Sequence, residues 1–270
     1  MMVLKEKKIH LARLALAAPF SHKARTKLGV HKLSLLRQLS YAQATLTIDG
    51  KYLYFGNGKV AGSTIRQLLF FHQTGRYFEG PLKHTTDGLK FGIDYWRDFK
   101  SQELHQGCFV FSFVREPEAR LRSCYFNKVV DPKNQVRNPH MNGLMKIGFD
   151  PNANQSSNFA RFVEYVAEEI TSDPYYCDHH IRSQTVNLAY EEISYDFLGR
   201  FENFDQDIAT VFKNSKDKHD VQSRIGKVWN NRSKSKILDI SSDTRSIIHE
   251  IYDKDYSNFG YIKEQHSLPI

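Results

Sequence analysis

Two loops that suit a phosphate group constrain the fold of this chain more than any other feature of its sequence. The first loop, residues 59–66, directly follows the apolar run 52–55, and the second begins at Arg115, directly after the apolar run 109–114. Each is followed by a helical pattern, and such repeated strand–loop–helix order predicts a doubly wound α/β sheet. Ligands of such sheets bind beyond the carboxyl ends of the strands, where both loops lie. Two loops of different design therefore predict a ligand that carries phosphate at two separate positions.

The remaining strand signals agree with this architecture. Residues 44–48 alternate as a strand, Asp49-Gly50 is a strong hairpin-turn signal, and residues 51–55 form the return strand. Residues 108–114 are nearly all apolar, as expected for a parallel strand covered on both faces. A third strand–loop–helix unit follows at residues 195–212. The predicted fold class is α/β, with a P-loop-like parallel sheet flanked by helices in a single domain.

Helical periodicity and end signals predict the other elements. Ile65, Leu68, Leu69 and His72 recur at helical spacing and place a helix from about residue 63 to Gly75, with His72 on its packed face. Pro117 suits the first turn of a helix that runs to about residue 130. Further helices are predicted over residues 158–170 and 242–252. We expect residues 76–107 to be irregular and residues 131–158 to form a long, functional loop.

Composition narrows the partners and the compartment. The chain has 270 residues with a formal net charge of +8, which favours anionic partners such as nucleic acid, anionic lipid, acidic polysaccharide or a phosphorylated cofactor. Three cysteines form neither a disulfide framework nor a zinc site and fit a reducing compartment. No run reaches transmembrane length. We expect residues 1–40, which are basic and mostly helical in pattern, to pack on a catalytic domain of residues 41–265.

The first loop has the chemistry of an anion site without a metal. A helix N-terminus presents unpaired backbone N–H groups to phosphate or sulfate, and Gly62 lets the backbone approach the anion. Ser63 and Thr64 add hydroxyl groups, and Lys59 adds a mobile positive charge. The match to a nucleotide-triphosphatase loop fails because Val60 follows Lys59 and no Ser or Thr stands where it would hold magnesium. A plain glycine turn with an incidental lysine is the alternative.

The second loop relies on side chains. Arg115 lies at the carboxyl end of a buried strand, where its guanidinium could grip phosphate with two hydrogen bonds. The alternative for Arg115 is a salt bridge to Glu116 or Glu118. Ser123 follows about two helical turns later, so it reaches the same phosphate only if the helix lies alongside the ligand; otherwise it is an ordinary helix serine.

Together these motifs resemble the Golgi-type carbohydrate sulfotransferases, notably the chondroitin/dermatan 4-O and HNK-1 group, which use 3′-phosphoadenosine 5′-phosphosulfate (PAPS). The resemblance covers roughly residues 50–262. It rests on the Lys59-Val60-Ala61-Gly62-Ser63 loop, on Val114-Arg115-Glu116-Pro117 with Arg120-Leu121-Arg122-Ser123-Cys124-Tyr125 behind it, on residues 180–185 and 195–207, and on the tail with Asn231-Arg232-Ser233 and residues 255–261.

The resemblance implies a sulfotransferase that moves a sulfonate group from PAPS to a hydroxyl of a carbohydrate, in line and without a metal. The 5′-phosphosulfate would be held by the first loop, and the 3′-phosphate by Arg115 and Ser123. Lys59 would neutralise the leaving oxygen, and His84, or as second choice His180, would be the general base. The implied cofactor-binding residues are Lys59, Ala61, Gly62, Ser63, Thr64, Ile65, Arg66, Arg115, Ser123 and Arg232.

The acceptor and the compartment follow from weaker signals. An anionic glycan or glycoconjugate would bind near residues 131–158, with Lys133, Arg137 and Arg182 as a basic rim. The family's anchor and stem are missing, and Ala189 and Tyr190 stand near the place of its luminal cysteine. Residues 180–185 resemble the family's His-Trp-x-Gln segment, but the Trp of that segment is replaced. These departures favour a bacterial-type, cytoplasmic enzyme over a Golgi one, with peripheral membrane contact still open.

Two other functions compete with this one. A P-loop nucleotide kinase-like phosphotransferase requires a magnesium-binding Ser or Thr after the loop lysine, and the sequence lacks it. A non-enzymatic nucleic-acid-binding protein requires basic residues clustered on one face with stacking aromatics, whereas here the aromatics fall mainly in strands and the basic residues are dispersed. We therefore expect no nucleic-acid partner.

Overall fold

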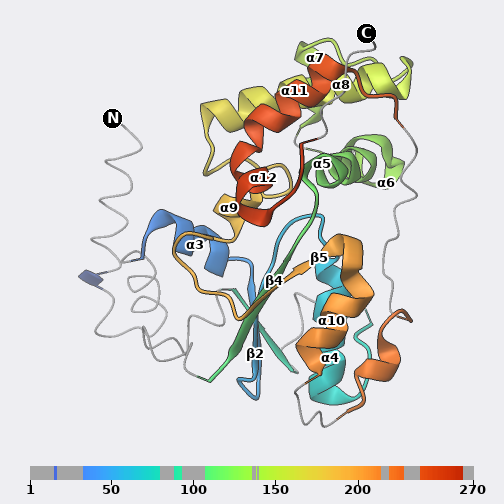
Figure 1. Cartoon of the computed structure of the whole chain (residues 1–270). Helices are drawn as coiled ribbons and strands as arrows, with labels where there is room; N and C mark the ends of the chain where they lie inside the picture. The colour runs from blue at the N-terminus through green and yellow to red at the C-terminus, as the bar shows by residue number, and fades with distance from the viewer. Residues whose placement is uncertain are drawn as a thin grey trace.

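The computed structural model describes residues 15–16, 33–79, 88–92, 107–135, 138, 140–213, 219–227 and 238–263. Its centre is a mixed five-stranded sheet of order β3-β1-β2-β4-β5 (Figure 1). The predicted hairpin is present, because β1 pairs antiparallel with β2, and β1 also pairs antiparallel with β3. The three strands β2, β4 and β5 are parallel. The predicted α/β fold is confirmed; the strands are β1 (Ala44–Thr47), β2 (Tyr52–Phe55), β3 (Leu89–Phe91), β4 (Phe109–Val114) and β5 (Phe197–Arg200).

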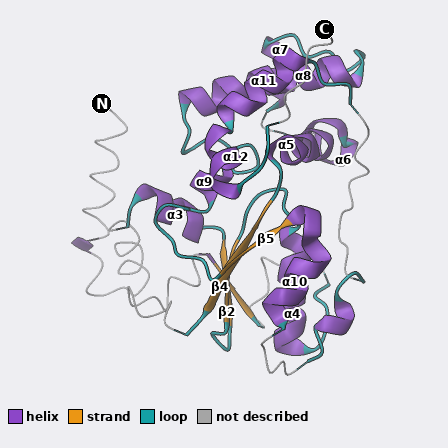
Figure 2. Cartoon of the chain, in the orientation of Figure 1, coloured by secondary structure: helices purple, strands orange, loops and turns teal. Residues whose placement is uncertain are grey.

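Both faces of the parallel strands are buried, which explains their continuous apolar sequences. Alternate residues point to opposite faces. Tyr54 and Phe111 belong to a core shared with α4 (Gly62–Thr74) and α10 (Phe204–Phe212). Leu53 and Val110 belong to the core on the other face, to which α3 (Leu35–Tyr41) contributes Tyr41 and α12 (Asp253–Phe259) contributes Phe259. The short helix α9 (Gln184–Asn187) lies beside α3 and α12 (Figure 2).

A third core lies among helices beyond the end of the sheet. It is built from aromatic and aliphatic side chains of α5 (Pro117–Tyr125), the π-helix η3 (Phe126–Val130), α7 (Met141–Lys146), α8 (Gln155–Ser172) and α11 (Ser242–Ile251). Figure 1 shows these helices stacked beyond the point where β4 leads into α5. The carboxyl ends of β2 and β4 are therefore covered by a helical layer. The remaining short elements are α6 (Pro132–Gln135), η4 (Phe201–Asn203) and η5 (Gln222–Arg224).

Most predicted elements are confirmed. Helix α4 ends against Gly75, whose left-handed φ of 72° explains why glycine stands there. His72 on its packed face is 1% exposed and contacts Asp49 at 3.1 Å. Helix α5 begins at Pro117, but its predicted continuation to residue 130 is the π-helix η3. The three cysteines are free.

Two predictions of irregular structure are wrong. Residues 131–158 are not one long loop, because α6, α7 and the start of α8 lie within them. Strand β3 lies within residues 76–107, where none was predicted. Its three residues are too few for a periodic pattern. Most of residues 1–40 lie outside the described residues, so their packing and the domain boundary at residue 40 stay predictions. None of the described helices is both long enough and apolar enough to cross a membrane.

Candidate functional site

The first loop joins β2 to α4 through a strained backbone. Lys59 and Ala61 have φ values of 68° and 52°, in the left-handed region that costs a non-glycine residue about 1–2 kcal/mol. Ala61 is the N-cap of α4, and no side chain caps this helix. The backbone N–H groups of Gly62 to Thr64, in the first turn, therefore have no side-chain partner. Strain held in this way at a helix N-terminus is typical of a functional loop.

Lys59 points from this loop to the π-helix. Its Nζ donates to Oδ1 of Asn127 at 2.8 Å. Burial lowers the pKa of Lys59 to about 8, and the positive charges of Lys128, Arg115 and Arg120 lower it further. The amine is still mostly protonated at pH 7. Several cations thus face one small region, as an anion site requires.

Arg115 follows β4 and connects the second loop to the first. Its Nη1 donates to the carbonyl of Lys59 at 3.3 Å, and its guanidinium lies 4.1 Å from the ring centroid of Phe201. Burial lowers the pKa of Arg115 to about 10, so the side chain stays charged at neutral pH. A cavity of about 250 Å³ is lined by residues 201–206, which include the Phe201 that Arg115 contacts.

The two neighbouring carboxylates are engaged elsewhere, so neither holds Arg115. Glu116 caps α5 by accepting from two backbone N–H groups of its first turn, and it also accepts from the hydroxyl of Tyr256 at 2.8 Å. Glu118 pairs with Nε of Arg245 at 2.8 Å. In the part of the chain that the structure describes, no carboxylate forms an ion pair with Arg115. The alternative of a local salt bridge is therefore not found.

Helix α5 lies alongside the first loop. The Nε of Arg120 donates to the carbonyl of Gly58 at 2.9 Å. Asn127, on the π-helix η3 that follows α5, accepts from Nζ of Lys59. Ser123 lies three residues after Arg120, a spacing that places both on one face of α5. Helix α5 thus runs alongside the first loop, and a contact between Ser123 and the phosphate at Arg115 stays a prediction.

Gln184 joins the two loops from α9. Its Oε1 accepts from Nδ2 of Asn57 at 2.9 Å and from the backbone N–H of Arg115 at 3.0 Å, and its Nε2 donates to the Arg115 carbonyl at 2.8 Å. Gln184 is fully buried, and its own N–H donates to Asp255 of α12. Sequence reasoning missed this role, although Gln184 belongs to the segment that resembles the family's His-Trp-x-Gln stretch.

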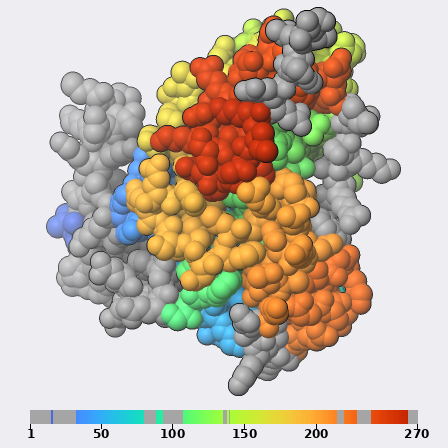
Figure 3. All heavy atoms as spheres, in the orientation of Figure 1, coloured from blue at the N-terminus to red at the C-terminus, as the bar shows by residue number. Residues whose placement is uncertain are grey.

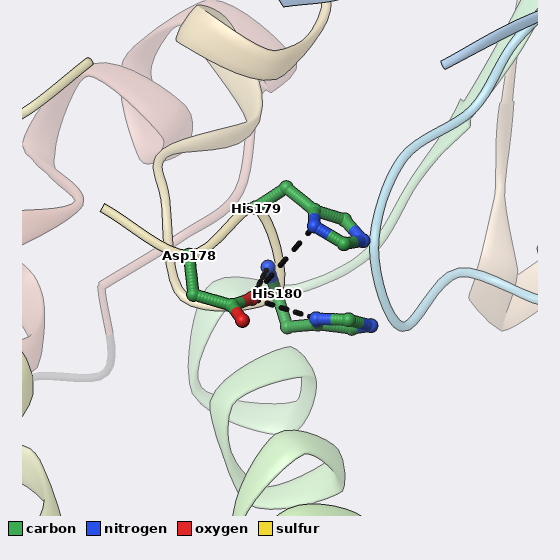
Figure 4. A group of neighbouring side chains, drawn as sticks. All are labelled: Asp178, His179 and His180. Atoms are coloured by element: carbon green, nitrogen blue, oxygen red, sulfur yellow. Dashed lines mark hydrogen bonds and ion pairs between the residues drawn. The ribbon is translucent and has the colours of Figure 1, made fainter. Parts of the chain in front are cut away.

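A histidine–aspartate pair lies against the first loop. Nδ1 of His180 and Oδ1 of Asp178 are 2.6 Å apart, and both imidazole rings of the segment turn Nδ1 toward Asp178 and Nε2 away from it (Figure 4). A Cβ on Gly58 would lie 2.8 Å from the His179 carbonyl and 3.0 Å from Cα of His180, so only glycine permits this close approach. Asp178 was not predicted, because its role depends on the turn that folds it back onto His180.

The protonation of this pair suits a proton acceptor. Burial lowers the pKa of His180, while the Asp178 carboxylate opposes that shift. Burial also raises the pKa of Asp178, but contacts from His140 and His180 outweigh it and hold that pKa well below its usual range. Burial lowers the pKa of His179 to about 3. The result is an ionised carboxylate beside neutral imidazoles, the arrangement of a general base and its orienting group.

Asp178, His179 and His180 are also the one group among the described residues whose ligand atoms gather closely enough for a metal ion, within 4.8 Å of one another. Their geometry fits a metal poorly. With metal–ligand distances near 2.0 Å, atoms 2.6 Å apart would subtend about 80° at the ion, against about 109° in a tetrahedral site. The two rings lie close together, with centroids 3.8 Å apart and planes tilted by 39°. A hydrogen-bonded pair describes this group better than a metal site.

Several predicted residues face away from the gathered groups. Ile65 is fully buried and its N–H donates to the Ala61 carbonyl. Arg66 donates to Oγ1 of Thr45 at 3.2 Å, on the strand β1. Arg182 is buried and donates to the Cys177 carbonyl, so it does not extend a surface rim.

Ser63 and Lys133 are exposed, and Thr64 is buried in the first turn of α4. His84, Arg137 and Arg232 lie outside the described residues.

The family model of the sulfotransferase family matches residues 46–262, and the chain belongs to this family. Among curated proteins, the chain is similar to carbohydrate sulfotransferase 12 of Mus musculus, at 26% identity over 175 residues, which are 58% of this chain and 41% of that protein. It is also similar to carbohydrate sulfotransferase 14 of Danio rerio, at 24% identity over 249 residues, which are 86% of this chain and 66% of that protein. The chain thus spans less than two thirds of the length of either relative. No solved structure matches it significantly.

Proposed function

We propose that this protein transfers a sulfonate group from PAPS to a hydroxyl of a carbohydrate, in line and without a metal. The observation that carries the proposal is the meeting of two unlike cationic sites at the carboxyl ends of adjacent parallel strands. One is the uncapped N-terminus of α4 with Lys59, and the other is Arg115, which has no acidic partner among the described residues. Membership of the sulfotransferase family supports a phosphosulfate donor over a nucleoside triphosphate.

Each end of the donor is assigned to one loop. Lys59 and the amides of Gly62 to Thr64 would hold the 5′-phosphosulfate, with Ala61, Ile65 and Arg66 as the backbone and packing that keep the loop in shape. Arg115 and Ser123 would hold the 3′-phosphate. Helix α5, which carries Ser123, runs alongside the first loop and would bring this serine toward the donor. Arg232, outside the described residues, remains a proposed contact of the donor.

The donor supplies an activated sulfonate whose S–O bond to the 5′-phosphate breaks during transfer. Lys59 would leave Asn127 and donate to the bridging oxygen, so that negative charge gathers beside an ammonium. Nε2 of His180 would take the proton of the attacking hydroxyl, while Asp178 holds the ring and stabilises the positive charge it gains. His84 stays a second proposed base.

Carbohydrate is the proposed acceptor because both curated relatives are named carbohydrate sulfotransferases. A negatively charged glycan suits the cations that remain near the site, Lys128 on η3 and the exposed Lys133 on α6. Arg137 would extend this rim. A cytoplasmic location remains a prediction.

The decisive experiment is transfer of labelled sulfonate from PAPS by the purified protein to a panel of glycans and small hydroxyl compounds. We expect product with at least one glycan, equal rates with magnesium and with a chelator, and inhibition by adenosine 3′,5′-bisphosphate but not by ATP. A protein that required magnesium and bound ATP more tightly than PAPS would be a phosphotransferase, and the proposal would fail.

The base is tested by comparing two variants under saturating donor. His180→Ala should lower kcat by about 10²–10⁴, the usual contribution of a positioned base, while the affinity for adenosine 3′,5′-bisphosphate stays within about twofold. His84→Ala is the matched comparison. Full activity in His180→Ala with a large loss in His84→Ala would assign the base to His84.

A further inference from the structure

We propose that His140, together with Tyr165, is a positioning residue that orients Asp178 so that His180 presents a free Nε2 to the acceptor. This inference rests on the proposed function, in which His180 is the base. His140 is the N-cap of α7 and precedes His180 by 40 positions, whereas Tyr165, on α8, precedes it by 15.

The four side chains form a continuous chain of polar contacts inside the protein. The hydroxyl of Tyr165, on α8, lies 3.0 Å from Nδ1 of His140. Nε2 of His140 lies 3.6 Å from Oδ2 of Asp178, whose other oxygen lies 2.6 Å from Nδ1 of His180. His140 and Tyr165 are 4% and 7% exposed, so water does not readily replace these contacts.

The hydrogen on each ring nitrogen follows from these contacts. Nε2 of His140 is buried and forms no hydrogen bond within the described part of the chain, and the atom it faces is a carboxylate oxygen. A hydrogen on Nε2 is attracted to that oxygen, whereas a lone pair would repel it, so Nε2 carries the hydrogen. Burial and Glu169 raise the pKa of Tyr165, so its phenol keeps its proton.

The hydrogen stays on Nε2 of His140 for either hydrogen-bond partner of the Tyr165 phenol. If Tyr165 donates to Nδ1, the hydrogen of His140 is on Nε2. If Tyr165 donates elsewhere, Nδ1 donates to the phenol oxygen, and Nε2 still keeps a hydrogen toward the carboxylate. In both cases Nε2–H faces Oδ2 of Asp178 and leaves Oδ1 for His180. The hydrogen of His180 is then drawn to Nδ1, and its Nε2 lone pair is left for the acceptor hydroxyl.

The surrounding structure holds His140 in this position. Its backbone N–H donates to Oδ1 of Asn138 at 3.0 Å, and Nδ2 of Asn138 donates to the Lys128 carbonyl at 3.0 Å. Because Lys128 lies on η3, next to the Asn127 that holds Lys59, one π-helix anchors both the loop lysine and the support of the base. A π-helix inserted in this way is often found at functional sites.

The test is a double-substitution cycle measured as sulfonate transfer. His140→Ala should lower kcat about tenfold, a part of the 10²–10⁴ that a positioned base contributes, with the KM for PAPS unchanged. His140→Gln, whose amide can donate to Asp178, should restore most of that loss, and Tyr165→Phe should lower kcat by about threefold. In a His180→Ala background, His140→Ala should cost nothing further, because it acts through the absent ring.

A second measurement does not depend on turnover. Nitrogen NMR of the imidazoles in the whole protein should show His180 with its hydrogen on Nδ1, and a mixture of tautomers in His140→Ala. Equal losses of kcat from His140→Ala in both backgrounds, or an unchanged His180 tautomer, would overturn the inference. A wild-type protein without sulfonate transfer but with the expected tautomers would instead reject the proposed function.

Discussion

The two loops follow the same strand–loop–helix plan but leave different parts of the chain free for an anion. In the first loop, the helix α4 has no side-chain cap and its entry residues are held in left-handed conformations, so backbone N–H groups remain available. In the second, the carboxylate of Glu116 already occupies the N-terminus of α5, and what is left for an anion is the Arg115 side chain, which has no ion pair with a carboxylate among the described residues. The residue at the N-cap thus decides whether backbone N–H groups or a side chain remain available to an anion at such a loop.

The largest effect should come from the first loop. Lys59→Ala should lower kcat by about 10²–10³, the cost of removing one donor from a developing negative charge. Lys59→Arg should retain the charge but not the reach, and recover only part of the rate. Steady-state transfer assays with both variants check this. A wild-type rate in Lys59→Ala would remove the lysine from the reaction.

Removing the Arg115 side chain of the second loop should weaken the binding of ligands that carry a 3′-phosphate. Arg115→Ala should weaken adenosine 3′,5′-bisphosphate about 10- to 100-fold, as expected for a lost hydrogen bond to a charged group, measured by calorimetry. Adenosine 5′-phosphate, which lacks the 3′-phosphate, serves as the control and should bind both proteins equally. An equal loss for both ligands would mean that Arg115 supports the loop rather than the 3′-phosphate.

What sequence reasoning could and could not predict follows from how local each feature is. Strands β1, β2, β4 and β5, the start of α5 at Pro117 and the packed face with His72 depend on neighbouring residues, and all of these were predicted correctly. The two loops could be predicted from the sequence for the same reason, since each is a continuous run of neighbouring residues. Strand β3 and helices α6 and α7 were missed because their few residues carry too little periodicity.

The missed parts of the candidate site are contacts between distant segments. Gln184 touches Asn57 and Arg115 across 127 and 69 positions, and Asn127 meets Lys59 across 68. No pattern in a single sequence marks such pairs, because their spacing is set by how the helical layer folds over the strand ends. Arg66 was predicted to bind the donor because of its position in the first loop, whereas in the structure its side chain donates to Thr45.

The comparison also predicts a dependence on pH that belongs to the first loop alone. Burial depresses the pKa of Lys59 to about 8, so the amine loses its proton as the pH rises through that value. If the bound anion restores the ordinary pKa, affinity for adenosine 3′,5′-bisphosphate should fall by up to about tenfold between pH 7 and pH 9. In Lys59→Arg the affinity should stay level, because arginine remains charged. A wild-type affinity that is flat over this range would contradict the assignment.

The smallest effects are changes in the free energy of unfolding. Substitutions at the N-cap of α4 and at the N-cap of α5 should change it in opposite directions. Ala61→Gly relieves a left-handed alanine and should raise the free energy of unfolding by about 0.5 kcal/mol, since the greater freedom of glycine in the unfolded chain offsets part of the gain. Glu116→Ala removes the cap of α5 and should lower it by about 1 kcal/mol. Glu116→Asp, which can still cap the helix while giving up the reach to Tyr256, separates the two roles of that carboxylate. Urea unfolding of the three variants measures these differences, and a loss of stability in Ala61→Gly would mean that the left-handed turn is not strained.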